Sequence, residues 1–258
     1  MFDPGFDIKP RTSPMGFIYG TDCFGPKEEN RRLDAIRASL KDPRCYGPEI
    51  VYSIAMDVGK TIHQPLLHRM SLLFGAVIFS AGRLGNEPVR SQGHVHVASP
   101  RCGWSTPEVY EIWEGKAVIY MQQRAEKYPG RCYAIEAVAG DVVVVPPGWP
   151  HATISADPHQ PLIFGAWCDR QYGFDYAALR RLGGIAWFPM LDGQTNLEWQ
   201  ANPNYAVSDL VRKRPEKYSP LGLHAGMPIC TQFEQNPEAF RFVPEPATYA
   251  SYWETFFP

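Results

Sequence analysis

Short apolar runs, each ending at Gly, Pro or Asp, dominate the middle of the chain. Most are four to nine residues long and rich in Val, Ile, Tyr, Trp and Thr, which is typical of β-strands. Between about residues 49 and 168 they read EIVYSIAMDV, LLFGAVIFSA, VRSQGHVHVAS, EVYEIWEG, KAVIYMQQ, CYAIEAVAG, DVVVVPP, HATISA and PLIFGAWCD. No helical segment is predicted between them. The pattern therefore predicts a mainly all-β antiparallel sandwich or barrel.

Helical patterns are few and lie mostly outside this core. The segment KEENRRLDAIRASLKDPR (27–44) has apolar residues at roughly helical spacing and predicts a helix that ends at Asp42-Pro43. FDYAALRRLGG predicts a second helix closed by a glycine pair, and residues 205–213 a short third one. Residues 1 to about 26 are predicted to form an extended arm.

These patterns divide the chain into three parts of one structural domain. Residues 1–48 form an N-terminal arm and helix, residues 49–184 the β-barrel, and residues 185–258 a C-terminal extension. The last 50 or so residues are too apolar for a free tail, so we expect them to pack on the core or on another subunit.

Composition and charge exclude several classes of protein. The chain has 45% apolar and 20% charged residues, which argues against wholesale disorder. Its 25 basic and 27 acidic residues provide no polycationic face for nucleic acid or membrane. The longest apolar stretch, Leu72–Phe79, is too short to span a bilayer, and the first residues, MFDPGFDIKPR, lack a secretory apolar run. We therefore expect a soluble cytoplasmic protein, with its six scattered cysteines reduced.

Four residues, His94, His96, Glu108 and His151, form the strongest chemical signal. His94 and His96 are two apart in a predicted strand, so their side chains point to the same face. Glu108 opens the next strand, and His151 follows the tight turn PPGWP. Three imidazoles and one carboxylate suit a borderline divalent ion, predicted as one Fe, Mn, Ni or Zn per subunit. Taken singly, the pair of histidines and His151 have ordinary structural interpretations that remain open.

The spacing around these residues is more specific. Gly140, Pro146, Gly148 and His151 spell G-x5-P-x-G-x2-H, and Glu108 with Gly115 spells E-x6-G. Both strings resemble the metal-binding motifs of the cupin superfamily. Eleven residues separate His96 from Glu108, more than is usual there, so this insert is either a loop at the metal site or a sign that Glu108 is the wrong carboxylate. The insert contains no other acidic residue, which favours Glu108.

A closer resemblance, covering about residues 31–185, is to the cupin-type glucose-6-phosphate isomerases. The strings SQGHVH, PEVYEIWEGKAVIYMQ, AGDVVVVPPGWPHATI, PLIFGAWC and GFDYAALRRLGG carry it. The resemblance implies a cupin jelly-roll barrel (a double-stranded β-helix) with a few peripheral helices and a C-terminal extension. It also implies a homodimer acting on a sugar phosphate.

The resemblance also implies roles for individual residues. Tyr52, Ser91, Gly93 and Tyr176 would bind the substrate, and its phosphate would lie near the first three. Glu108 would shuttle the hydrogen, and Tyr110 would orient a substrate hydroxyl. The chain departs from the family pattern where Val77 replaces a hydroxyl residue, Gln92 a lysine found in some members, and Phe174 a histidine.

The implied reaction interconverts glucose 6-phosphate and fructose 6-phosphate, through either a metal-stabilised enediolate or a hydride shift. The sequence does not choose between these two routes. Val77 and Phe174 motivate an alternative, a sugar-phosphate-binding module without turnover. A further alternative is an oxygenase that uses the same three-His, one-Glu set with open positions for O2.

Overall fold

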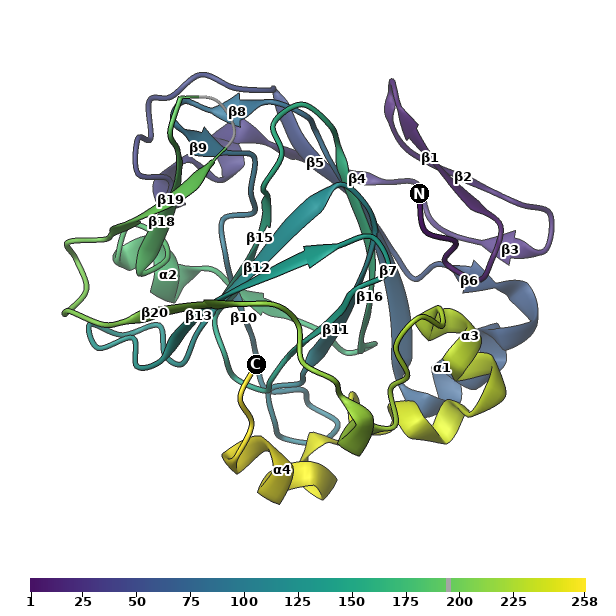
Figure 1. Ribbon diagram of the computed structural model, residues 1–258. Helices are drawn as coiled ribbons and strands as arrows, with labels where there is room; N and C mark the ends of the chain where they lie inside the picture. The colour runs from purple at the N-terminus through teal and green to yellow at the C-terminus, as the bar shows by residue number, and fades with distance from the viewer. Residues whose placement is uncertain (194–195) are drawn as a thin grey trace.

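The computed structural model of the protein describes residues 1–193 and 196–258. A six-stranded β-sheet forms one side of the central barrel (Figure 1). The strand order is β14-β11-β16-β7-β5-β4, with antiparallel pairing throughout. The strands are β4 (Glu29–Arg32), β5 (Ile50–Met56), β7 (Leu72–Phe79), β11 (Glu108–Glu114), β14 (Val142–Val145) and β16 (Leu162–Asp169).

A four-stranded sheet faces the first and completes a barrel. Its order is β15-β12-β13-β20, comprising β15 (His151–Ser155), β12 (Lys116–Gln122), β13 (Cys132–Val138) and β20 (Leu210–Lys213). Side chains from both sheets meet in one apolar cluster inside the barrel, for example Ile112 of β11, Ile119 of β12 and Ile135 of β13. This architecture confirms the predicted cupin-type β-barrel.

Strands β7 and β16 are buried along their whole length. The inner face of β7 presents Val77 to the barrel, whereas its outer face presents Phe74 and Ile78 to a second apolar core. That outer core also contains Phe233 and Phe240 from the C-terminal region. Because both faces are covered, these strands appear in the sequence as continuous apolar runs rather than as alternating ones.

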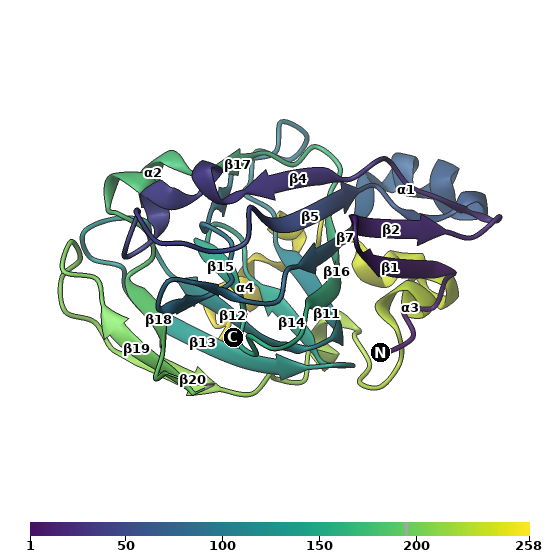
Figure 2. The ribbon, with the colours of Figure 1, turned by 90° about the horizontal axis from the view of Figure 1, so that it is seen from above.

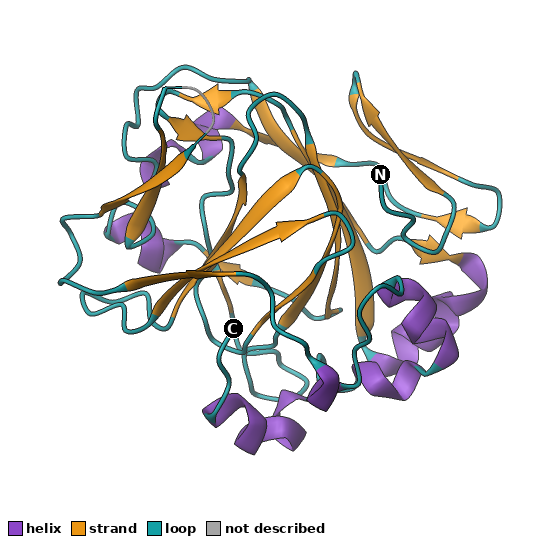
Figure 3. Cartoon of the chain, in the orientation of Figure 1, coloured by secondary structure: helices purple, strands orange, loops and turns teal. Residues whose placement is uncertain are grey.

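The helices lie at the periphery of the barrel (Figure 3). They are α1 (Gln64–Met70), α2 (Ala177–Arg181), α3 (Ile229–Gln235) and α4 (Ala250–Glu254). Helix α2 lies within the predicted helical segment and is followed by Gly183 at a φ of 70°, a conformation that favours glycine. No helix among the described residues has the length and apolar character needed to cross a membrane.

Short antiparallel strand pairs lie outside the two main sheets. Figure 2 shows the N-terminal hairpin of β1 and β2 beside β7, and the pair of β18 and β19 at the opposite end of the molecule. The pairs are β1 (Ile8–Thr12) with β2 (Met15–Tyr19), β3 (Cys23–Phe24) with β6 (Gly59–Lys60), β8 (Arg83–Leu84) with β9 (Glu87–Pro88), β10 (Val95–His96) with β17 (Phe174–Asp175), and β18 (Trp187–Leu191) with β19 (Leu197–Ala201). The arm of residues 1–26 is thus largely extended.

Two helix predictions were wrong. Within the predicted helix at 27–44, residues Glu29–Arg32 form the edge strand β4, and two 3-10 turns at Leu33–Ala35 and Arg37–Ser39 follow. The predicted helix at 205–213 ends instead in β20, which pairs in parallel with β13. In both places, pairing with an open sheet edge outweighs local helical spacing. The structure also places α1 inside the core region, where no helix was predicted.

Glu111 joins the barrel to the C-terminal segment. Its Oε1 accepts a hydrogen bond from the Ile229 N–H at 2.7 Å, and its Oε2 accepts one from Trp113 Nε1 at 2.9 Å. The Glu111 side chain is fully buried. Burial raises its pKa to about 7, although the two hydrogen bonds favour the carboxylate.

This raised pKa predicts that Glu111 makes the protein less stable as the pH rises. The folded state holds the Glu111 proton more tightly than the unfolded chain does, so the stabilisation is present below pH 4.5 and is lost as the pH rises through 7. Between pH 5 and 7.5 the wild type should lose about 2 kcal/mol of unfolding free energy relative to Glu111→Gln. Urea denaturation at both pH values measures this. Glu254→Gln, at an exposed position, is the control. The prediction fails if the difference in unfolding free energy between wild type and Glu111→Gln does not change with pH, or if the difference between wild type and Glu254→Gln changes equally.

Candidate metal centre

Backbone pairing brings the predicted metal ligands together from four places in the chain. His151 begins β15, Glu108 begins β11, and His96 lies in β10. His94 forms an isolated bridge with His151, in which each residue donates its backbone N–H to the other's carbonyl, at 3.0 and 2.9 Å. The His94 and His96 rings stack 5.2 Å apart, as expected of residues two apart in an extended segment.

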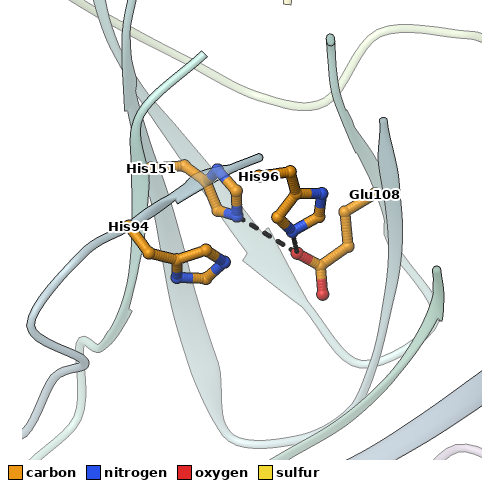
Figure 4. Close-up of side chains that lie close together, drawn as sticks. All are labelled: His94, His96, Glu108 and His151. Atoms are coloured by element: carbon orange, nitrogen blue, oxygen red, sulfur yellow. Dashed lines mark hydrogen bonds and ion pairs between the residues drawn. The ribbon is translucent and has the colours of Figure 1, made fainter. Parts of the chain in front are cut away.

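The four side chains point toward one another inside the barrel (Figure 4). One ligand atom from each of His94, His96, Glu108 and His151 lies within 4.8 Å of all the others. Glu108 Oε2 is 3.1 Å from His151 Nε2 and 3.3 Å from His96 Nε2. The predicted set of three imidazoles and one carboxylate is therefore a real cluster that could hold a metal ion.

Backbone carbonyls orient two of the imidazoles. His96 Nδ1 lies 2.9 Å from the Thr106 carbonyl oxygen, and His151 Nδ1 lies 2.9 Å from that of Trp149. A carbonyl oxygen only accepts hydrogen bonds, so each Nδ1 carries the proton. In the neutral imidazole this leaves the Nε2 lone pair facing the centre, which is the arrangement found in metal-binding histidines.

The buried Nε2 atoms of the cluster show whether a metal ion fits this site. His94 Nε2 and His96 Nε2 are both buried and have no hydrogen-bond partner among the described residues. Leaving buried polar atoms unpaired is costly, and a metal ion would satisfy both nitrogens. Burial, followed by the neighbouring His151 and His96, also holds the pKa of His94 well below its usual range. His94 is thus neutral at pH 7, as a ligand must be.

Glu108 is the ionised member of the cluster. Burial opposes its ionisation, but the two imidazoles of His151 and His96 next to its Oε2 outweigh burial and hold the pKa of Glu108 well below its usual range. The Tyr110 hydroxyl donates to Glu108 Oε2 at 2.9 Å, and the Cys168 thiol donates to Oε1 at 3.4 Å. One carboxylate among three imidazoles is a donor set for borderline divalent ions.

The eleven-residue insert between His96 and Glu108 is a loop anchored at both ends of the site. Ala98 and Ser105 bridge its two sides, and Ser105 Oγ accepts the Gly148 N–H at 2.9 Å, in the turn before His151. Arg101 forms an ion pair with Glu245 of the C-terminal region at 3.2 Å. The insert therefore does not displace Glu108 from the cluster.

Tyr176 and Phe174 flank the cluster. The Phe174 ring lies 4.4 Å from the His94 ring and 5.4 Å from the His96 ring, because β17 pairs with β10. The Tyr176 ring lies 5.9 Å from that of His94. An apolar ring thus stands beside the metal ligands at the position where the family resemblance expects a histidine.

The remaining predicted substrate residues lie nearby, with local structural roles of their own. The buried Tyr52 ring stacks on Phe79 at 4.7 Å. Ser91 Oγ accepts the Thr153 N–H at 3.0 Å and remains free to donate its hydroxyl proton. Gly93 has a φ of +84°, and a Cβ there would lie 2.9 Å from Leu179, so both conformation and packing require glycine.

Sequence reasoning missed Cys168 and the two orienting carbonyls. Cys168 follows a buried apolar run, and nothing in its local sequence distinguishes it from a core cysteine. Any backbone can supply a carbonyl, so Thr106 and Trp149 carry no sequence signal either. All six cysteines are free in the structure, as expected.

Comparison with known proteins identifies relatives along most of the chain. The family described as "Glucose-6-phosphate isomerase (GPI)" matches residues 33–206, which include all four cluster residues. The glucose-6-phosphate isomerase of Thermococcus kodakarensis is 30% identical over 62% of this chain and 78% of its own length. That of Thermococcus litoralis is 32% identical, with a match spanning 43% of this chain and 54% of its own length. A putative glucose-6-phosphate isomerase of Rhizobium meliloti is 25% identical over 81% of this chain and 91% of its own.

Solved structures give more distant matches. An oxalate oxidase aligns over 49% of this chain and 55% of its own at 14% identity, with a TM-score of 0.35. An oxalate decarboxylase of Bacillus subtilis aligns over 49% of this chain and 28% of its own at 15% identity, with a TM-score of 0.34. The family match, by contrast, covers two thirds of the sequence. The chain belongs to the family of cupin-type glucose-6-phosphate isomerases.

Proposed function

We propose that this protein is a metal-dependent isomerase that interconverts glucose 6-phosphate and fructose 6-phosphate. One observation carries the proposal: His94, His96, Glu108 and His151 converge within 4.8 Å inside the barrel, and the Tyr110 hydroxyl contacts the same carboxylate. The names of the relatives supply the substrate class. The reaction itself, the metal and the residue roles below are our inference.

The proposed reaction moves a hydrogen between C1 and C2 of the open-chain sugar while the two oxygens exchange carbonyl and hydroxyl character. A bound divalent ion would supply a Lewis acid that polarises the carbonyl and stabilises negative charge beside it. Glu108 is our candidate for the group that takes the proton from one carbon and returns it to the other. Because Glu108 would also be a ligand, its proton affinity would be lowered, and hydride transfer stays the alternative.

Tyr110 is our candidate for the residue that orients a substrate hydroxyl. Burial first, and then the charge of Glu108, raise the pKa of Tyr110 well above its usual value. The phenol therefore stays protonated and acts as a hydrogen-bond donor at any physiological pH. We further propose that Tyr52, Ser91, Gly93 and Tyr176 contact the substrate. The Tyr176 ring 5.9 Å from His94, and the place of Gly93 directly before His94, support this.

One observation favours a second candidate function. The Phe174 ring packs against His94, and the Val77 side chain, which cannot donate a hydrogen bond, faces the barrel interior. Neither residue can supply the acid–base or hydroxyl group expected there. These features suit a protein that binds a sugar phosphate without turning it over. The homodimer stays a prediction from the family resemblance, and the cytoplasmic location stays a prediction from composition and the first residues.

The isomerase proposal predicts turnover of fructose 6-phosphate. The purified apoprotein loaded separately with Fe(II), Mn(II), Ni(II) or Zn(II) should form glucose 6-phosphate at a kcat of roughly 1 s⁻¹ or more with at least one metal. A coupled dehydrogenase assay measures the product, and chelation should stop turnover. Binding of 6-phosphogluconate with no turnover under any of the four metals would support the non-catalytic alternative instead.

The ligand assignment predicts which variants lose the metal. His96→Ala and Glu108→Gln should each retain at least about tenfold less metal than the wild type after dialysis, because even indirect partners of a metal change its affinity by 10–100-fold. Elemental analysis measures the content. His159→Ala, which removes an exposed histidine outside the cluster, is the matched control. Full metal retention by Glu108→Gln would show that this carboxylate is not a ligand.

The role of Tyr110 predicts an effect on catalysis without loss of metal. Tyr110→Phe keeps the ring in the core but removes the donor to Glu108 Oε2. With the metal in excess, so that the site stays occupied, we expect kcat to fall about 100-fold or more, since a positioned hydrogen-bond donor contributes on this scale. Steady-state kinetics and elemental analysis on the same preparation separate an effect on kcat from loss of metal. An unchanged kcat would remove Tyr110 from the mechanism.

A further inference from the structure

Two arginines beside the metal centre have no carboxylate partner among the described residues. Arg31 lies in β4 and Arg180 in α2, 149 residues apart in sequence, and neither appears in any ion pair of the part of the chain described. The buried Nε of Arg31 also lacks any hydrogen-bond partner there. The Arg31 side chain is half-buried, where an unpaired guanidinium is costly unless something else compensates its charge, whereas Arg180 is exposed.

Backbone pairing places Arg31 on the barrel side of the sheet. Arg31 is directly opposite Tyr52 in the β4–β5 register, so the two side chains share a face. Tyr52 belongs to the apolar cluster inside the barrel. Burial raises the pKa of Tyr52 to about 12, and the positive charges of Arg31 and Arg180 both act to lower it. The Arg31 side chain therefore lies on the same face as the Tyr52 phenol.

Contacts hold Arg180 on the same side as the metal ligands. Its Nε donates to Gln92 Oε1 at 2.9 Å, and one of its terminal nitrogens donates to the Ala35 carbonyl at 3.0 Å. The guanidinium also lies 5.5 Å from the centre of the Tyr176 ring. Gln92 immediately precedes Gly93 and His94, and its own Nε2 is buried without a partner among the residues described. Arg180 is exposed, but these contacts hold its guanidinium beside Gln92 and the Tyr176 ring.

The distance between the metal cluster and Arg180 is short enough for a phosphorylated six-carbon chain to reach both. The Tyr176 ring lies 5.9 Å from His94 and 5.5 Å from the Arg180 guanidinium, so that guanidinium lies within about 11 Å of the His94 ring. An extended chain from C1 of a hexose to the phosphorus of its 6-phosphate spans roughly 8 Å at backbone-like bond geometry. One molecule can therefore contact both the metal centre and the arginines.

We propose that Arg31 and Arg180 bind the phosphate group of the substrate, with the phenols of Tyr52 and Tyr176 beside it. Guanidinium groups bind phosphate through strong, charge-assisted hydrogen bonds. The inference rests on the proposed function for the identity of the substrate, but not for the anion site itself.

The affinities for a sugar acid with and without a 6-phosphate group test the site. Isothermal titration of metal-loaded protein with 6-phosphogluconate and with gluconate gives the contribution of the phosphate as a ratio of Kd values. Arg31→Met and Arg180→Met should each raise the Kd for 6-phosphogluconate about 10–100-fold and leave that for gluconate unchanged. Arg31→Lys and Arg180→Lys should recover part of the affinity, because they retain the charge.

Neighbouring arginines provide matched controls. Arg32→Met removes the next residue of β4, which forms an exposed ion pair with Glu49, and Arg181→Met removes the exposed neighbour of Arg180. Both should bind 6-phosphogluconate like the wild type. Unchanged metal content and thermal unfolding confirm that each variant is folded.

The outcomes separate this inference from the proposed function. If the wild type isomerises fructose 6-phosphate and the two Met variants raise KM but not kcat, both proposals stand. If it isomerises and the variants keep wild-type affinity for 6-phosphogluconate, the arginine site is wrong and the isomerase survives. If it binds 6-phosphogluconate through the arginines without turnover, the arginine site stands and the isomerase fails. A wild type that does not discriminate between 6-phosphogluconate and gluconate overturns the arginine site.

Discussion

The central constraint on this protein is the burial of three imidazoles and one carboxylate against one another inside a β-barrel. His94, His96, His151 and Glu108 leave two buried nitrogens without partners, an arrangement that a well-packed core avoids unless an ion completes it. The ligands also come from different strands. Glu108 begins a strand of the six-stranded sheet and His151 a strand of the four-stranded sheet, so the cluster exists only when both sheets are in register.

Strand β11 links the metal ligands to the outer core, because its side chains point alternately to the two faces of the sheet. Glu108 and Tyr110 face the barrel and the metal ligands, whereas Glu111 and Trp113 face the outer core. Glu111 in turn accepts the N–H of Ile229, the first residue of α3. A one-residue slip of this strand would both remove a ligand and detach the C-terminal segment. The site and the C-terminal packing therefore depend on the same register.

The sequence could predict the barrel and the cluster because both rest on local patterns. The strands show as short apolar runs, and His94, His96 and His151 lie in motifs whose spacing is set by turns and strand geometry. What failed depended on distant partners. Residues 29–32 pair with β5 instead of continuing a helix, because an open sheet edge offers hydrogen bonds that local spacing does not reveal. Arg180 likewise reaches Gln92 across 88 residues, a contact that no single-sequence motif encodes.

The proposed metal centre and the proposed phosphate site together form one site with a cation-binding end and an anion-binding end. One end offers three imidazoles and a carboxylate for a cation, and the other offers Arg31 and Arg180 for an anion. Phe174 lies against His94 at the first end, so the polar contacts there must come from the ion and Tyr110 rather than from a further histidine. A small keto acid or diol would engage the metal end and leave the arginines unpaired. An open-chain sugar phosphate satisfies both ends at once, which is why the charge distribution favours an isomerase over an oxygenase on this barrel.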